Sequence, residues 1–218
     1  MTAIGVLALQ GAFREHAQKL RLCGAEAREV RLPGDLDGVS GLVIPGGEST
    51  TISKLMTLYG FPEKIRRFSG GGRPVFGTCA GAIVLARRLG GKPQGFLDLI
   101  DVDVERNAYG RQVDSREVSL SIEALGPPPF PVIFIRAPVI RSIGEGVRPL
   151  ATYNDTVVLA RQENVLVATF HPELTADLRI HAYFLRMVEE ASQKDNQGRA
   201  APSAGEKRTL SKHPQRCG

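Results

Sequence analysis

The 218-residue sequence contains no tryptophan, three cysteines and few aromatic residues, which make up 6% of the chain. Its cysteines, Cys23, Cys79 and Cys217, are too few and too widely spaced for a disulfide framework or a metal site. This usage is typical of a reducing compartment, and we predict a cytoplasmic protein without a metal ion. With 42% hydrophobic residues, the chain can bury a core without disulfide bonds.

A long hydrophobic run is also lacking. The apolar N-terminal segment ends at Gln10, whereas a membrane span needs about 20 apolar residues. No basic residue precedes this segment, although a signal peptide would begin with basic residues. We therefore expect neither a signal peptide nor a membrane partner.

Acidic residues are fewer than basic ones, and the formal net charge is +5. Residues 193–218 hold six basic and two acidic residues, so they carry +4 of this total, and they contain one large aliphatic side chain. We predict a single domain over residues 1–192 and a flexible basic tail over residues 193–218. A nucleic-acid-binding module is the alternative that the charge suggests, but no helix-turn-helix or aromatic-basic pattern supports it.

Short apolar runs alternate with helical patterns in the first 90 residues, which predicts an α/β fold with parallel strands. The strands are expected at residues 3–9, 27–32, 41–44 and 74–77, and the helices near 13–20, 49–58, 62–70 and 80–89. Between residues 97 and 169, apolar and polar residues alternate, which predicts an antiparallel extension of the sheet. A last helix is expected over residues 177–191.

Residues 77–81 read Gly-Thr-Cys-Ala-Gly and join an expected strand to an expected helix. This pattern is the cysteine form of a nucleophile elbow, in which a sharp turn exposes the nucleophile and small neighbours leave room for it. The helix N-terminus favours a thiolate at Cys79, and the backbone N–H of Ala80 is placed to bind an oxyanion. A buried cysteine in a tight strand–helix junction is the alternative.

Of the four histidines, His171 follows an expected strand directly, at the edge where open α/β sheets place their sites. Pro172 favours an extended segment in which Glu173 faces the same way as His171 and orients its ring. A turn before the last helix is the alternative. We expect His16, which follows Arg14 and Glu15, to be solvated, and His181 to serve in packing.

Residues 45–50 form a second glycine-containing loop, in which an N–H could complete an oxyanion hole with Ala80. Its Glu48 and Ser49 could bind an ammonium or polar groups of a substrate. An ordinary loop followed by a helix N-cap is the alternative. Arg106 and Arg136 each follow a strand-like run and could bind a carboxylate, although an isolated arginine is more often a surface charge.

These motifs resemble the class I glutamine amidotransferases, and more narrowly the glutaminase subunits of the deoxyxylulose-independent pyridoxal 5′-phosphate synthases. The matching segments are residues 5–16 (GVLALQGAFREH), 44–51 (IPGGESTT), 77–81 (GTCAG), 106–112 (RNAYGRQ), 134–138 (FIRAP) and 171–173 (HPE). The resemblance implies a three-layer flavodoxin-like fold with a mixed, mostly parallel sheet. It also implies hydrolysis of L-glutamine to glutamate and ammonia, with no cofactor.

The resemblance assigns roles residue by residue. Cys79 would attack the side-chain amide, His171 would transfer protons, and Glu173 would hold His171. An oxyanion hole would form from Gly47 and Ala80. The glutamine-binding residues would be Gly47, Glu48, Ser49, Arg106, Ile135 and Arg136.

The resemblance also implies a partner, a (β/α)8-barrel synthase subunit that receives the ammonia in a complex of twelve subunits of each kind. The peptide between Gly46 and Gly47 would reorient on docking, near Gln10. The sequence departs from the family pattern at Arg116, where phenylalanine is expected, and in a proline run at 127–129. Another cysteine hydrolase, such as a γ-glutamyl hydrolase or a deglycase-like relative, is the rival, and segment 107–112 argues against it.

Overall fold

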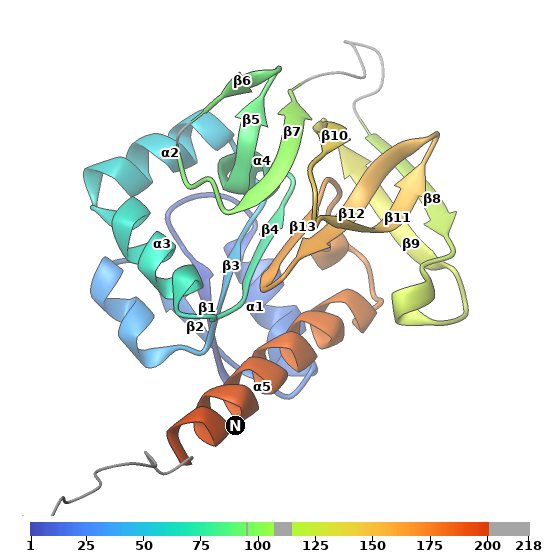
Figure 1. Ribbon diagram of the computed structural model, residues 1–218. Helices are drawn as coiled ribbons and strands as arrows, with labels where there is room; N and C mark the ends of the chain where they lie inside the picture. The colour runs from blue at the N-terminus through green and yellow to red at the C-terminus, as the bar shows by residue number, and fades with distance from the viewer. Residues whose placement is uncertain (95, 107–114, 201–218) are drawn as a thin grey trace, which may run out of the picture.

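The computed structural model describes residues 1–94, 96–106 and 115–200, and its centre is an eleven-stranded mixed sheet (Figure 1). Five neighbouring strands are parallel, in the order β2-β1-β3-β4-β13. The first four are the parallel strands that the sequence predicts, whereas β13 lies in the range where an antiparallel extension was expected. Their bounds are β1 Ala3–Leu7, β2 Glu26–Val30, β3 Gly41–Ile44, β4 Val75–Thr78 and β13 Val165–Ala168.

The sheet continues from β13 through β12, β10, β7, β5 and β6, and β11 pairs with β12 along nearly its whole length. Most of these pairings are antiparallel, so the predicted antiparallel extension is confirmed. The bounds are β5 Ala86–Leu89, β6 Lys92–Pro93, β7 Ile100–Glu105, β10 Val139–Ile143, β11 Arg148–Tyr153 and β12 Thr156–Gln162. Strands β8 (Ser115–Leu120) and β9 (Phe130–Ile135) form a separate two-stranded sheet.

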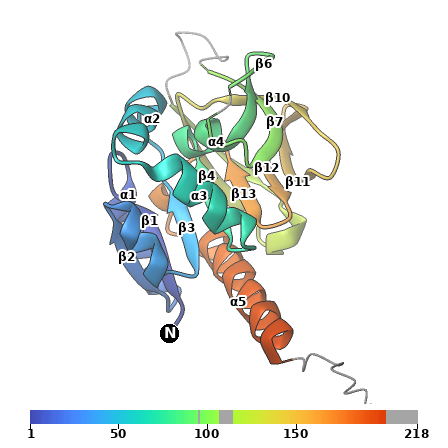
Figure 2. The same ribbon diagram turned by 60° about the vertical axis from the view of Figure 1, so that its left-hand side comes forward.

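Helices cover both faces of the sheet and complete three layers (Figures 1 and 2). One core lies under α2 (Ser49–Leu58), α3 (Phe61–Gly70) and α4 (Ala80–Leu85). The other lies under α1 (Phe13–Leu22) and α5 (Arg179–Ala200), together with β9. The short 3₁₀ helices are η1 (Pro33–Gly38), η2 (Glu123–Leu125) and η3 (Pro172–Leu174). The predicted flavodoxin-like α/β fold is confirmed.

Two expected boundaries were wrong. The helix predicted over residues 80–89 ends at Leu85, and Ala86–Leu89 form strand β5 instead. Pairing with β7 and a turn at Gly90 and Gly91, both at positive φ, override the local helical pattern. The last helix, expected over residues 177–191, instead spans Arg179–Ala200 and includes residues 193–200 of the predicted tail. Extending an existing helix costs far less than starting one. Residues 201–218 of that predicted tail lie outside the described residues.

None of the helices in the described part of the chain combines the length and apolar character that a membrane span requires.

Candidate active site

Cys79 occupies a strained elbow between β4 and α4. Its backbone has φ 49° and ψ −104°, a conformation that residues other than glycine rarely adopt. The two glycines that flank it leave no room for a side chain, because a Cβ at Gly81 would lie 2.1 Å from the carbonyl oxygen of Ile44. A Cβ at Gly77 would lie 2.5 Å from Cδ1 of Leu85. The sharp turn predicted from the glycine spacing is therefore confirmed.

His171 lies beyond the carboxyl end of β13, which is the parallel neighbour of β4. Its Nδ1 lies 2.7 Å from Oε1 of Glu173. The segment is not extended as predicted, because Pro172–Leu174 form the 3₁₀ turn η3. Proline suits the first turn of a helix, where its missing N–H is not needed. The turn still brings the carboxylate of Glu173 back to the His171 ring.

The environment of this pair shifts both pKa values toward the charged forms. Burial would lower the pKa of His171, but hydrogen bonds with Cys79 and Glu173 raise it to about 10. Burial would raise the pKa of Glu173, but the charges and hydrogen bonds of His16 and His171 hold it well below its usual range. The geometry therefore favours a protonated ring between Cys79 and a buried carboxylate.

The buried carboxylate predicts a specific pH dependence of stability. Below pH 4.5, the ordinary value for glutamate, the unfolded chain binds a proton at Glu173 that the folded chain does not bind. The free energy of unfolding should therefore fall as the pH falls, by up to about 1.4 kcal/mol per pH unit from this group. Urea unfolding between pH 6 and pH 3 should give a shallower slope for Glu173→Gln than for the unchanged chain. Equal slopes would contradict this assignment.

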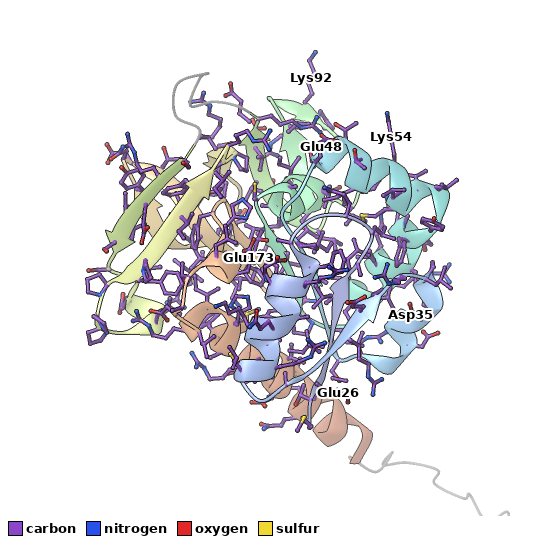
Figure 3. All side chains as sticks on the ribbon, turned by 180° about the vertical axis from the view of Figure 1, so that it is seen from behind. Glu26, Asp35, Glu48, Lys54, Lys92 and Glu173 are labelled. Atoms are coloured by element: carbon purple, nitrogen blue, oxygen red, sulfur yellow. The ribbon has the colours of Figure 1, made fainter. Side chains whose placement is uncertain are left out.

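His16 is fully buried, and the prediction that it is solvated was wrong. Its Nε2 lies 3.0 Å from Oγ1 of Thr78 and 3.3 Å from Oε2 of Glu173, and its Nδ1 lies 2.9 Å from Nε2 of His181. Figure 3 shows Glu173 near the centre of the molecule, beside α1. The position of His16 three residues after Phe13 was the signal that could have placed it on the apolar face of the helix.

The glycine loop after β3 is fixed from two sides. The N–H of Gly46 donates to Oγ1 of Thr78 at 3.0 Å, and its carbonyl accepts from the N–H of Ala12 at 3.0 Å. A Cβ at Gly46 would lie 2.6 Å from Cε1 of His171, and one at Gly47 would lie 2.3 Å from Oε1 of Gln10. The loop therefore packs directly against the His171 ring and the β1–α1 loop.

Glu48 provides the N-cap of α2 with its side chain. Its carboxylate accepts from the backbone N–H groups of Thr50 and Thr51 and from the hydroxyl of Thr51. These hydrogen bonds, chiefly that of the Thr51 hydroxyl, lower the pKa of Glu48 to about 2. The N-cap is therefore Glu48 itself, directly before Ser49. Both the loop and the N-cap of the alternative interpretation are thus present.

A cavity of about 530 Å³ opens over Cys79 and contains the other predicted contact residues. The predicted residues that line it are Gly47, Glu48, Ser49, Cys79, Ala80, Arg106, Ile135, Arg136 and His171. Glu173 lies behind His171. Both arginines directly follow strands, β7 and β9, as expected. Three neighbouring strands, β3, β4 and β13, thus deliver the glycine loop, the elbow and His171 to one edge of the sheet.

A larger depression of about 900 Å³ lies at the opposite ends of the strands, beside α5. No cysteine or histidine is found among the described residues that line it. In the described ranges, no cluster of histidine, cysteine, aspartate and glutamate has the arrangement of a metal site. The cavity over Cys79 is therefore the stronger candidate for chemistry.

The departures from the family pattern lie away from this cavity. Arg116 in β8 donates from Nη1 to the hydroxyl of Tyr153 at 2.9 Å, so an ordered contact occupies the place of the expected phenylalanine. Arg179 holds the proline run, donating to the carbonyl oxygen of Pro128 at 2.6 Å. Cys23 is half-buried, and burial raises the pKa of its thiol. Segment 107–112 lies outside the described residues.

The sheet order, the cysteine elbow and the neighbouring histidine are those of the flavodoxin-like enzymes of the class I glutamine amidotransferase type. A family model, the SNO glutamine amidotransferase family, matches residues 6–190, and the chain belongs to this family. It is accordingly a hydrolase that acts on glutamine.

Relatives and solved structures agree with this assignment. The chain is 55% identical over 190 residues to "Pyridoxal 5'-phosphate synthase subunit PdxT" of Pelotomaculum thermopropionicum, covering 87% of this chain and 97% of the relative. A protein of the same name from Moorella thermoacetica is 54% identical over 185 residues, covering 85% and 98%. A crystal structure of a glutamine amidotransferase superimposes with a TM-score of 0.81 at 51% identity, covering 85% of this chain and 98% of that one.

Proposed function

We propose that the protein hydrolyses L-glutamine through a Cys79–His171–Glu173 triad and passes the ammonia to a synthase subunit that makes pyridoxal 5′-phosphate. The observation that carries the proposal is the placement of His171, whose Nδ1 hydrogen-bonds Glu173 and whose ring lines the same cavity as Cys79. Cys79 and His171 both line the cavity, so a substrate amide can reach the nucleophile and its proton donor together.

In the proposed reaction, the sulfur of Cys79 attacks the side-chain amide carbon of glutamine, and the amide oxygen becomes an oxyanion. The backbone N–H groups of Ala80 and Gly47 stabilise that charge. His171 then protonates the leaving nitrogen, and the C–N bond breaks to give ammonia and a thioester. A water molecule, deprotonated by His171, hydrolyses the thioester to glutamate and restores the Cys79 thiol. Glu173 holds the ring and stabilises its positive charge throughout.

The cavity also supports a binding mode for the substrate. Arg106 and Arg136 are exposed at its rim and can bind the α-carboxylate of glutamine, with Ile135 beside them. Ser49 and the backbone of Gly47 face the same space. The carboxylate of Glu48 is already bonded to the first turn of α2, so we assign its contribution to fixing the loop for the substrate.

The partner is proposed from the names of the relatives, which describe a synthase subunit. A (β/α)8-barrel partner in a complex of twelve subunits of each kind is part of the proposal. The carbonyl of Gly46 accepts a hydrogen bond from Ala12, and in a planar trans peptide the N–H of Gly47 points the opposite way. Reorientation of this peptide on docking would break the Ala12 bond, so a partner that moves the β1–α1 loop would control the oxyanion hole.

The same proposal takes residues 1–192 as the catalytic domain, consistent with the family match over residues 6–190, and the cytoplasm as its location. The decisive experiment is co-expression with a synthase subunit, followed by assays of ammonia release and of glutamine-dependent formation of pyridoxal 5′-phosphate. We expect both activities in the mixture and little ammonia release from the chain alone. Cleavage of γ-glutamyl peptides without the partner would instead support the rival cysteine hydrolase.

A further inference from the structure

The Glu173 carboxylate has two oxygens, and they face two different histidines. Oε1 lies 2.7 Å from Nδ1 of His171, and Oε2 lies 3.3 Å from Nε2 of His16. The side chains of Glu173 and His16 are both fully buried. Apart from this ion-pair contact, Oε2 has no hydrogen-bond partner among the described residues. His16 is therefore the group that compensates the buried charge on this oxygen.

The hydrogen bond between His16 and His181 indicates where the protons lie. If Nε2–H of His181 donates to Nδ1 of His16, then Nε2 of His16 carries a proton that faces Thr78 and Glu173. The reverse arrangement points a lone pair of His16 at the carboxylate and leaves the N–H at Nδ1 of His181 buried without an acceptor. A buried N–H without an acceptor raises the free energy of the folded state more than a buried acceptor without a donor, so the first arrangement is favoured.

His16 also contacts the group that holds the glycine loop. Its Nε2 lies 3.0 Å from Oγ1 of Thr78, and that oxygen accepts the N–H of Gly46. Thr78 is fully buried, so no solvent competes for these contacts. One N–H of His16 is thus shared between the carboxylate behind His171 and the hydroxyl that fixes the loop beside it.

We infer that His16 is a positioning residue that fixes the Glu173 carboxylate and, through Thr78, the Gly46 loop. This inference rests on the proposed triad. His181 supports this role by holding the Nδ1 side of the His16 ring. Loss of the Nε2 donor would let the carboxylate rotate away from His171 and loosen the loop that carries Gly47. The reacting atoms themselves would stay in place.

Two variants of His16 test this inference, because both carry a side-chain amide but differ in the length of the side chain. The amide of His16→Gln extends to the position of Nε2, whereas that of His16→Asn extends only to the position of Nδ1. With the synthase partner present, we expect His16→Asn to lower kcat by about 10-fold to 100-fold, the range for a lost hydrogen bond to a charged group. His16→Gln should stay within about threefold of the unchanged chain, and KM for glutamine should change little in both.

The pH profile separates positioning from packing. The N–H of His16 helps to hold the pKa of Glu173 down, so in His16→Asn the acidic limb of kcat should move to higher pH. Leu20→Ala is the matched control, since Leu20 is buried on the same helix without touching the site. It should lower Tm without changing kcat or its pH profile. If His16→Asn likewise lowered Tm without changing kcat or its pH profile, the inference would be overturned.

A measurement on the unchanged chain does not depend on the folding of any variant. Nitrogen-15 NMR of the histidine-labelled protein should find Nε2 of His16 protonated, and an unprotonated Nε2 would overturn the inference. Failure of the triad proposal itself has a different signature. In that case the unchanged chain with its partner would release no more ammonia from glutamine than Cys79→Ala does.

Discussion

Replacing Cys79 with alanine should lower ammonia release from glutamine by about 10⁴-fold or more, because no other group at the elbow can form the thioester. The measurement is the rate of ammonia release in the presence of the synthase partner. Binding to the partner should be preserved, because Cys79 is 7% exposed and lies at the base of the cavity rather than on the outer surface. Retention of one-tenth of the rate would refute the assignment of the nucleophile.

The variant Cys23→Ala is the control for this experiment. Cys23 caps the end of α1 and lies outside the cavity, so its replacement should leave the rate unchanged. A thiol-specific electrophile that resembles glutamine should label the unchanged chain and Cys23→Ala equally, and Cys79→Ala not at all. Labelling of Cys79→Ala would locate the reactive thiol elsewhere.

Gly81→Ala should have the largest effect on folding. The added Cβ would lie 2.1 Å from the backbone oxygen of Ile44, and neither α4 nor β3 can move without disturbing the elbow. Overpacking of a well-packed core typically costs about 1–3 kcal/mol, and a clash between two backbones should reach or exceed the upper end. Urea unfolding followed by circular dichroism measures this cost.

Gly34→Ala is the matched control, because a Cβ at Gly34 would meet no atom within 4 Å. We expect its free energy of unfolding to lie within about 0.5 kcal/mol of that of the unchanged chain. If Gly81→Ala were as stable as this control, then the close packing of α4 on β3 would not be essential to the elbow.

The elbow and His171 could be predicted from sequence because local rules govern both. Glycines on either side of Cys79 predict a sharp turn, and a histidine directly after an apolar strand lies at the carboxyl edge of the sheet. The rest depends on contacts between distant segments. The pairing of β5 with β7 converts the end of an expected helix into a strand, and nothing within residues 86–89 indicates this partner.

His16 shows the same limit within the site. The charged residues Arg14 and Glu15 directly before it suggested a solvated residue, and only the docking of α1 against His181 of α5 shows what surrounds it. The turn at Pro172 was the alternative and not the expected conformation, because proline is compatible with both an extended segment and the first turn of a helix. The predicted contact between His171 and Glu173 is nevertheless present, because the 3₁₀ turn also brings the two side chains together.

The single hydrogen bond between Ala12 and the Gly46 carbonyl has a thermodynamic consequence. If docking of the partner and binding of glutamine both favour the reoriented peptide, the two events share one coupling free energy. Glutamine must then tighten the complex by the same factor by which the partner tightens glutamine binding. Titrations of the partner with and without glutamine, using Cys79→Ala to prevent turnover, should give a factor clearly above one, and a factor of one would exclude a shared conformational switch.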